Sequence, residues 1–553
     1  MPFVFLFCML ALVVVVGRLV YLQLIAGETY AQRASDRRSN VQVLQAKRGT
    51  IYDRNGNILA ASEPCYDVYC NPQEIKDPNA VAKIVAQWLG GESADYVNQL
   101  GEVDKTFVYL KQKADRDASE KLRGDLISQE IPGVYLLDQM RRVYPYGATA
   151  GQILGKVDMD GEGVSGLELV YNKELSGKNG EQVLEVGSGG TPIAGAVAEV
   201  TEPEEGKDIV LSIDVDVQRL AEEETAKAQK SAKAKSGFCM VTDPRTGEIL
   251  ASCSTPYADL TKPDELTPES LNLRMVSDSY EPGSIFKVLT AAIGIESGLV
   301  KTNDYFAIPG RVQVGDDLVA DDDGRMETMD MNLREILRRS SNAGVAQITQ
   351  EVIGEEKFSE GIERFGIGQM TGIDYPGETV GIVKKLDEYD PSSAGSMSFG
   401  QGLSIPMVQM VKAVGAVADG GILHTPHFAT SVGGEEADWP SVGQAISEDT
   451  AEKVADMMVT VVEEGTATTA AVKGFDVAAK TGTGEQSENG RYMQGKYMAS
   501  LIGFAPAQRP EVLVYVGLNE TPYLAYSSAG PAFSAIMGEV LTDMGVLSTS
   551  RGL

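Results

Sequence analysis

The sequence predicts a membrane-anchored α+β protein: an N-terminal anchor, a turn-rich mixed α/β domain, and a larger domain with an antiparallel β-sheet flanked by helices. Three observations predict this architecture. The first residues form a long apolar run, and the stretch from 41 to about 201 is rich in Gly, Pro, Asp and Asn turn signals. Strand hairpins lie at both ends of the C-terminal half, with helical patterns between them.

Residues 1–26 form the predicted transmembrane anchor. Phe3–Val16 is wholly apolar and Leu19–Ile25 nearly so, and together they approach the roughly 20 residues that span a bilayer. Arg18 interrupts the run, but an arginine near one end of a span can snorkel to the interface. A cleaved signal peptide is the alternative. No basic segment precedes the run and no convincing cleavage site follows it, so we expect an uncleaved, single-pass anchor.

Residues 27–225 form the predicted pedestal domain, which carries no catalytic pattern. Near its end, "DIVLSID" (Asp208–Asp214) is typical of a strand, and the Glu, Lys and Ala-rich stretch that follows to about Lys235 is typical of a helix.

Residues 226–553 form the predicted C-terminal domain. It begins with a hairpin near Gly237–Cys253 and closes with another, made of "YMASLIGFAPA" and "EVLVYVGLNE". The expected helices are Ser284–Ser297, Asn332–Arg339, Ala343–Ile353, Pro406–Asp419, Glu448–Glu464 and Pro531–Gly545.

Composition excludes two classes of function. The net charge of −31, from 48 Lys+Arg against 79 Asp+Glu, argues against a nucleic-acid partner. The five cysteines contain no CxxC pair, so we expect no zinc site. Cys65/Cys70 and Cys239/Cys253 are the possible pairs. We expect small buried thiols, with Cys239 and Cys253 as neighbours across the first hairpin.

The segment "YEPGSIFKVLTAA" places Lys287 three residues after Ser284. By itself, Ser284 is typical of a helix N-cap. A nucleophilic serine needs a base, and the only histidines, His424 and His427, lie in a turn where we expect them at the surface. Lys287 would share a helix face with Ser284, so it is the candidate base.

Two further stretches make the pattern specific. "RRSSNAG" contains Ser340 and Asn342, and "AAKTGTGEQ" contains Lys480, Thr481, Gly482 and Thr483. Ser-x-x-Lys, Ser-x-Asn and Lys-Thr-Gly, in this order, form the motif set of penicillin-binding proteins and serine β-lactamases. Ser340 follows Ser284 by 56 residues and Lys480 follows Ser340 by 140, and these spacings also fit the motif set.

These residue types suit acyl transfer. The backbone N–H of Ser284, at a helix N-terminus, and that of Thr483 are the expected oxyanion hole. Gly482 would let a substrate backbone lie along its strand. Lys480, Thr481 and Thr483 offer a cation and two hydroxyls to a substrate carboxylate.

Over nearly its whole length the chain resembles the class B, monofunctional penicillin-binding proteins. "RGTIYDRNGNILA" (Arg48–Ala60), "RRVYPYG" (Arg141–Gly147) and "GVSGLE" (Gly163–Glu168) resemble motifs of the family's non-catalytic dimerisation domain. "TEPEEGKDIVLSID" resembles the usual lead-in to the family's transpeptidase domain, and "SFGQGLSI" (Ser398–Ile405) resembles a segment that flanks the active site. "YEPGSIFK" resembles the cell-division and sporulation branch.

The resemblance implies peptidoglycan D,D-transpeptidation without a metal or cofactor. Ser284 attacks the D-Ala–D-Ala carbonyl of a donor stem peptide, and an amine of a neighbouring stem takes the acyl group. By the same resemblance Lys287 is the general base, Ser340 relays protons, Asn342 binds the acyl chain, and Lys480, Thr481 and Thr483 hold the terminal carboxylate. β-Lactams would acylate Ser284. Implied partners are division or sporulation membrane proteins, including a lipid II polymerase.

Three alternatives remain. A serine β-lactamase shares the motifs, but nothing marks a deacylating glutamate. A bifunctional enzyme would need a glycosyltransferase domain with a histidine, and none precedes His424. A penicillin-binding sensor or septal scaffold without turnover differs from an enzyme only in an assay.

The implied substrate lies outside the cytoplasmic membrane, so we expect Met1 inside and residues 41–553 outside. The positive-inside rule places Lys and Arg on the inner flank of a span. Here Arg33, Arg37 and Arg38 follow the apolar run. We therefore expect the natural chain to begin upstream with a short basic segment.

Overall fold

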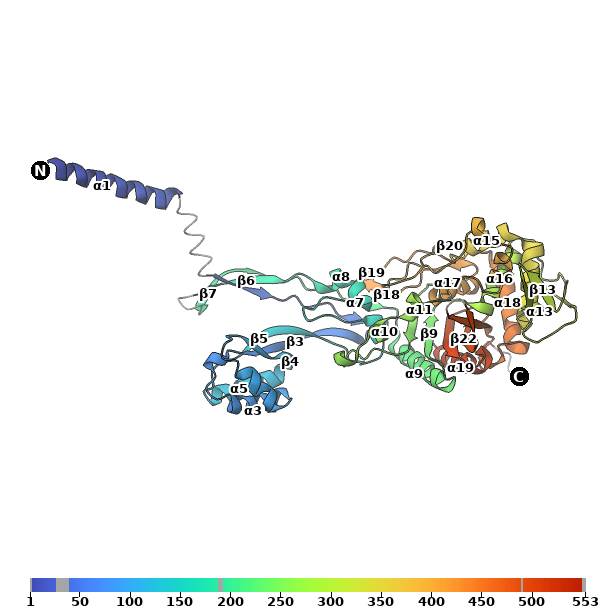
Figure 1. The fold of residues 1–553 in the computed structure, drawn as a ribbon, viewed down its shortest axis with the longest axis horizontal. Coiled ribbons are helices and arrows are strands. Elements are labelled where there is room, and N and C mark those ends of the chain that lie inside the picture. The colour runs from blue at the N-terminus through green and yellow to red at the C-terminus, as the bar shows by residue number, and fades with distance from the viewer. Residues whose placement is uncertain (1, 26–38, 187–191, 489–490, 550–553) are drawn as a thin grey trace. The chain divides into compact units, whose positions relative to one another are not determined.

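The computed structural model describes residues 2–25, 39–186, 192–488 and 491–549 (Figure 1). Two compact units form: residues 1–49, 63–141 and 176–206 belong to the first, and residues 50–62, 142–175 and 207–553 to the second. The units do not follow the expected boundary at 225/226. Helix α9 (Val215–Ser231) runs through that position, and its whole length belongs to the second unit.

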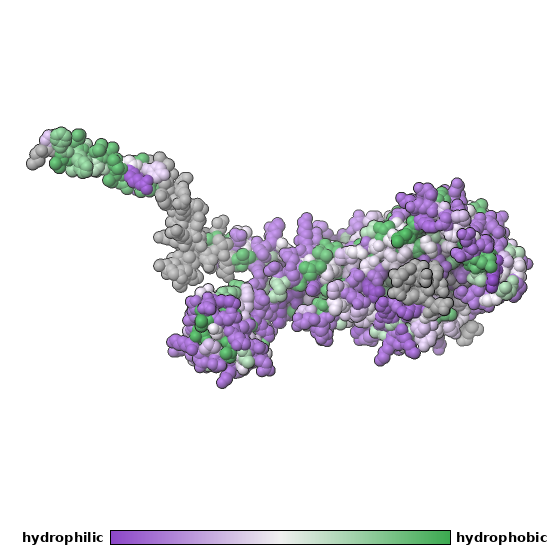
Figure 2. All heavy atoms as spheres, viewed as in Figure 1, coloured by the Kyte–Doolittle hydropathy of each residue, from purple (hydrophilic) through white to green (hydrophobic). Residues whose placement is uncertain are grey.

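The N-terminal run is helical. Helix α1 (Pro2–Val20) continues into a π-helical turn, Tyr21–Ile25. Pro2–Gln23 is long and apolar enough to cross a membrane, and none of that helix's residues is buried within the protein. Figure 2 shows the apolar side chains along it. Exposed apolar residues of this number are expected where lipid replaces water.

The first unit contains two sheets. Strand β6 (Gly180–Val186) pairs antiparallel with β1 (Ser39–Leu44) and with β7 (Pro192–Thr201). In the other sheet, β3 (Ile58–Cys70) lies between β4 (Val108–Ala114) and β5 (Val134–Val143). A separate hydrophobic core joins these strands to three helices, α3 (Pro78–Leu89), α4 (Ser93–Leu100) and α5 (Arg116–Ser128).

The second unit is built on a five-stranded sheet of order β10-β9-β23-β22-β21, and every neighbouring pair is antiparallel. Helices that pack on it include α9 with α19 (Ala525–Asp543), and α11 (Arg274–Ser277) with α17 (Met407–Ala418), while α18 (Glu448–Glu464) packs against the edge strand β21. Successive residues of β23 are buried, which requires cover on both faces and explains the continuous apolar runs in the sequence. The predicted antiparallel sheet with flanking helices is confirmed. The strands are β9 (Ser236–Thr242), β10 (Ile249–Ser254), β21 (Ala478–Glu488), β22 (Arg491–Ala505) and β23 (Val512–Thr521).

Most expected helices of this unit are present. Helices α13 (Leu333–Arg339) and α18 (Glu448–Glu464) match closely, and the predicted 343–353 helix consists of α14 (Asn342–Ile348) followed by a π-helical turn. The last helix was expected to start at Pro531. Instead α19 begins at Ala525 and contains Pro531.

Three smaller expectations have clear outcomes. Cys239 and Cys253 lie directly opposite each other in the β9–β10 hairpin, and both are free and buried, as expected. Cys65 and Cys70 are also free and buried. The surface expectation is wrong for His427, which is 4% exposed because its ring stacks on Trp439 at 4.8 Å.

Candidate active site

Ser284 lies in a tight turn, η4 (Gly283–Phe286), of 3₁₀ type, and helix α12 (Lys287–Glu296) begins only after it. The expected helix start at Ser284 is therefore wrong. Neither η4 nor α12 has a side-chain N-cap hydrogen bond, so Ser284 is not a cap. Its side chain is partly exposed, which leaves the hydroxyl accessible to a substrate.

The turn is tight because a strand passes beside it. Gly283 has φ +59°, and a Cβ there would lie 3.1 Å from the carbonyl oxygen of Thr483. Its N–H donates to the Gly400 carbonyl oxygen at 3.0 Å. Glycine permits both the left-handed backbone and this close approach, so it fixes Ser284 beside β21.

Two buried lysines converge on Ser340. Lys287 Nζ donates to Asn342 Oδ1 at 2.6 Å, to the Ser340 carbonyl at 2.6 Å and to Ser340 Oγ at 3.2 Å. Lys480 Nζ donates to Ser340 Oγ at 2.9 Å and to the Thr481 carbonyl at 3.0 Å. Both lysines are 0% exposed. The structure thus brings four of the predicted residues into one hydrogen-bonded cluster.

Burial without a neighbouring carboxylate changes the protonation of these lysines. Burial lowers the pKa of Lys287 from 10.5 to about 7, and the charges of Asp322 and Asp321 partly oppose this. Burial lowers the pKa of Lys480 well below its usual value, as does the charge of Lys287, while Asp322 acts in the opposite direction. A neutral amine at Lys287 near neutral pH can accept a proton from a serine hydroxyl.

Ser340 has an unusual backbone conformation. It caps the C-terminus of α13 with φ +59° and ψ 40°, while Ser341 caps the N-terminus of α14. A non-glycine residue in this region costs of the order of 1–3 kcal/mol and persists where its surroundings impose it. The conformation lets one residue present both its carbonyl and its hydroxyl to Lys287.

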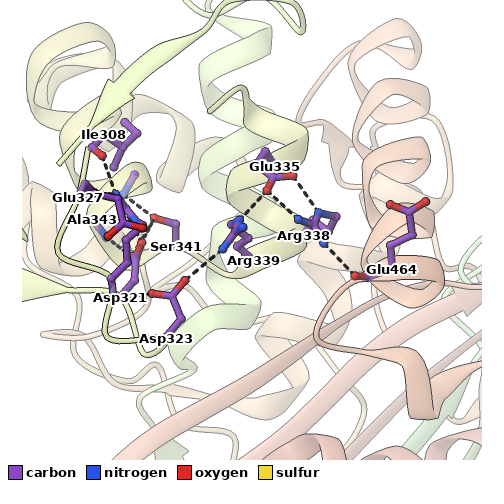
Figure 3. A network of polar contacts seen from close by, with 12 residues as sticks. Ile308, Asp321, Asp323, Glu327, Glu335, Arg338, Arg339, Ser341, Ala343 and Glu464 are labelled. Atoms are coloured by element: carbon purple, nitrogen blue, oxygen red, sulfur yellow. Dashed lines mark hydrogen bonds and ion pairs between the residues drawn. The ribbon is translucent and has the colours of Figure 1, made fainter. Parts of the chain in front are cut away.

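The surroundings that hold this turn were not found from the sequence (Figure 3). Both carboxylate oxygens of Asp321 accept from Ser341 Oγ at 2.8 Å, and one accepts from the Ala343 N–H at 3.0 Å. Arg325 Nη2 pairs with Asp321 at 2.8 Å, and the side chains of both are buried. The acidic run "DDDGR" was the only available signal, and such a run is usually a solvated loop.

Strand β21 carries the remaining predicted residues and ends the sheet, so it has a strand partner on one side only. The Thr481 hydroxyl lies 2.9 Å from that of Thr466, and Thr483 is partly exposed. In the structure Gly482 has a packing role. A Cβ there would lie 2.5 Å from Ser500 Oγ and 2.9 Å from the Pro282 carbonyl, so glycine lets η4 pack against the strand.

Within the described residues, Ser284 Oγ makes no hydrogen bond to Lys287. Catalytic hydrogen bonds are often long without substrate and shorten in the reactive complex. The arrangement provides an accessible hydroxyl, a lysine amine of lowered pKa on the same short segment, and a second hydroxyl shared by two lysines. This set of groups can transfer an acyl group and relay the protons.

The sequence is similar to known protein families and to named proteins. Residues 237–538 match the penicillin binding protein transpeptidase domain, and residues 43–211 match the penicillin-binding protein dimerisation domain. The chain is 33% identical to "Probable peptidoglycan D,D-transpeptidase PenA" of Neisseria meningitidis, over 97% of this chain and 91% of that protein. It is 30% identical to stage V sporulation protein D of Bacillus subtilis, over 98% and 85% of the two chains.

A solved structure is similar over a comparable length. Penicillin binding protein 3 of Mycobacterium tuberculosis, complexed with ampicillin, superposes with a TM-score of 0.72 at 25% identity. The match covers 93% of this chain and 98% of that one.

Proposed function

The chain belongs to the class B penicillin-binding proteins, and on this premise we propose that it is a serine-type peptidoglycan D,D-transpeptidase with Ser284 as its nucleophile. The carrying observation is that Lys287, Ser340, Asn342 and Lys480, of which both lysines are buried, converge in one hydrogen-bonded cluster next to the turn that bears Ser284. Its product, an amide cross-link between two stem peptides, would serve cell-wall synthesis at the septum or in the spore.

In the acylation step, Ser284 Oγ attacks the carbonyl carbon between the two D-alanines of a donor stem. Its proton moves to neutral Lys287, and the N–H groups of Ser284 and Thr483 hold the oxyanion. The C–N bond then breaks. Lys287 returns the proton through Ser340 Oγ to the departing nitrogen, and free D-alanine leaves an ester on Ser284.

In the second step, an amine of a neighbouring stem attacks the ester carbonyl. Its proton passes to Lys287, the C–O bond to Ser284 breaks, and Ser284 Oγ regains a proton. The product is an amide cross-link, and the enzyme returns to its starting state. Asn342 Oδ1 accepts from Lys287, so its Nδ2 is the group we assign to the acyl chain.

The terminal carboxylate of the donor would lie against Lys480, Thr481 and Thr483. Because Lys480 is buried and bound to Ser340 Oγ, we propose that the hydroxyls contact the carboxylate directly. The arriving carboxylate would supply the counter-charge that Lys480 lacks, favour its protonated form and so be attracted by its charge. β-Lactams would mimic the donor and occupy the same subsite.

Penicillin and a lipid-linked donor test this function on the purified full chain. We expect a long-lived adduct that peptide mapping assigns to Ser284, and cross-linked product with release of D-alanine. Adduct turnover within seconds would indicate a β-lactamase. A stable adduct without cross-linking, with donor and acceptor both supplied, would indicate a sensor or scaffold.

We also propose that helix α1 is a single-pass anchor that holds the rest of the chain outside the cytoplasmic membrane, next to membrane partners that include a lipid II polymerase. The apolar span supports the anchor. A reporter fused after Leu553 should be active only outside the membrane, and activity inside would reverse the proposed topology.

A further inference from the structure

Thr466, which lies outside the three motifs, contacts the strand that carries Thr481. Its Oγ1 is 2.9 Å from Thr481 Oγ1. Thr481 is only 8% exposed, whereas Thr466 is partly exposed. Each hydroxyl has one hydrogen to donate and can also accept. If Thr481 donates to Thr466, the O–H of Thr466 remains available to a group in the site.

The backbone at Thr466 is fixed by close packing. Helix α18 ends at Glu464, and the N–H groups of Gly465 and Ala467 both donate to the Val461 carbonyl at 3.1 Å. A Cβ at Gly465 would lie 2.6 Å from the carbonyl oxygen of Arg338. The last turn of α13 therefore lies directly against the segment that leads to Thr466.

Arg338 joins the two helices by hydrogen bonds (Figure 3). Its Nη1 donates to the Glu464 carbonyl at 3.0 Å, and its Nε and Nη2 donate to Glu335 at 2.8 and 2.7 Å. A cation is favoured at a helix C-terminus, and the bidentate pair with Glu335 fixes the direction of the guanidinium. Arg338 therefore holds the end of α18, one residue before Gly465.

The same cluster of charged side chains extends to the loop that contains Asp321 and Asp323. Arg339 donates to Glu335 at 2.6 Å and to Asp323 at 3.2 Å. Asp323 follows Asp321, which holds the Ser341 turn, by two residues (Figure 3). Three ion pairs and the hydrogen bond from Arg338 to the Glu464 carbonyl thus connect the loop beside Ser340 with the end of α18.

We propose that Thr466 supplies a further hydroxyl to the subsite for the donor's terminal carboxylate, and that Arg338 is the residue that positions it. The inference rests on the proposed function, because that function places a carboxylate at Thr481. An ionised carboxylate accepts about four hydrogen bonds, so a third hydroxyl beside Thr481 and Thr483 has an acceptor to bind. Thr466 acts on the substrate directly, and Arg338 acts through the backbone of α18.

The test compares two donors on the purified full chain. One is an N-acyl-D-alanyl thiolester whose leaving thiol carries a carboxylate, and the other is the same thiolester with a primary amide in its place. Thiol release gives the second-order rate of acylation. Thr466→Val should lower the rate with the carboxylate donor about tenfold, the order expected for one hydrogen bond to a charged group, and the amide rate less than about twofold. Thr466→Ser, which keeps the hydroxyl, should restore the rate.

Arg338→Met should lower the acylation rate with the carboxylate donor relative to the rate with the amide donor. Arg334→Met is its matched control. Arg334 also joins α13 to α18, through the Asp456 carbonyl at 3.0 Å and Thr460 Oγ1 at 2.7 Å, but farther from Thr466 along the chain. Both variants remove an interhelical arginine, so only Arg338→Met should change donor preference. Equal losses on both donors, or no loss with Thr466→Val, would overturn the inference. A wild-type chain that forms no Ser284 ester from either donor would instead refute the proposed function.

Discussion

Two buried sets of charged side chains in the second unit are built differently. Arg142 Nε donates to Glu168 Oε1 at 2.6 Å, and their side chains are 3% and 0% exposed. Lys287 and Lys480 are equally buried, but their Nζ atoms contact hydroxyl, amide and carbonyl oxygens. Among the described residues, neither lysine has a carboxylate within ion-pair distance.

The difference separates a structural use of buried charge from a chemical one. A counter-charge in contact offsets part of the cost of burial and makes the pair a rigid connection, here between the segments "RRVYPYG" and "GVSGLE". Burial without a counter-charge favours the neutral amine, so the proton can move at physiological pH. At the candidate active site the fold therefore bears the cost of burying two lysines where an exchangeable proton is useful.

The largest expected effect is the loss of the base. Lys287→Ala should lower the rate of Ser284 acylation by penicillin about a hundred- to ten-thousandfold, the range that a general base contributes. Intact-mass kinetics measures the rate, and circular dichroism checks the fold. If the variant reacts near the wild-type rate, the base lies elsewhere and Lys480 is the first candidate.

Breaking the Arg142–Glu168 pair should lower the stability of the protein and leave acylation of Ser284 intact. Arg142→Met leaves the Glu168 charge buried, so the free energy of unfolding should fall by about 3–5 kcal/mol, with an unchanged pH dependence of acylation. The control is Arg141→Met. Arg141 pairs with Glu63 and Asp115 at 3.3 Å, and both carboxylates are 52% exposed, so its loss should cost at most about 1 kcal/mol. Equal losses in the two variants would contradict the comparison.

Removing a buried lysine should instead raise the free energy of unfolding. Because burial lowers the pKa of Lys287 to about 7, the unfolded chain binds a proton that the native chain has lost between pH 7 and 10.5. Wild-type stability therefore rises with pH across this window, and below it the burial cost is fully present. Lys287→Met should be more stable than wild type near pH 6, with a difference that shrinks toward pH 10. Chemical denaturation at several pH values measures this, and a less stable variant at pH 6 would refute it.

Sequence alone predicted the parts of the site whose signal is local. Ser284 and Lys287 are three residues apart, and the later motifs are short strings, so composition and spacing identify them. Asp321, Arg325 and Thr466 were missed because their roles arise from contacts between distant segments: Thr466 meets Thr481 across a helix end. The helix start at Ser284 was wrong for the same reason, since the 3₁₀ turn depends on the strand that passes beside Gly283.

The sheet was predictable because its strands are buried on both faces, which produces long apolar runs that need no knowledge of pairing. The division into units was not. Strand β2 (Ile51–Tyr52) pairs in parallel with β8 (Ile209–Leu211), although more than 150 residues separate them, and this pairing brings an early segment into the second unit. No local pattern reveals such a return of the chain.

The smallest expected effect concerns Asp322, the exposed acid whose charge opposes the lowering of the pKa of Lys287. Asp322→Asn removes this charge, so the pKa of Lys287 should fall further and the amine should stay neutral to lower pH. The acid limb of the acylation–pH profile should therefore move to lower pH by roughly a few tenths of a unit, and less at high salt, because exposed charges are screened. Asp321→Asn is the informative comparison. It should move the limb in the same direction and also lower the rate at every pH, since Asp321 holds the Ser341 turn by hydrogen bonds. A shift of the Asp322→Asn limb to higher pH would show that another group sets it.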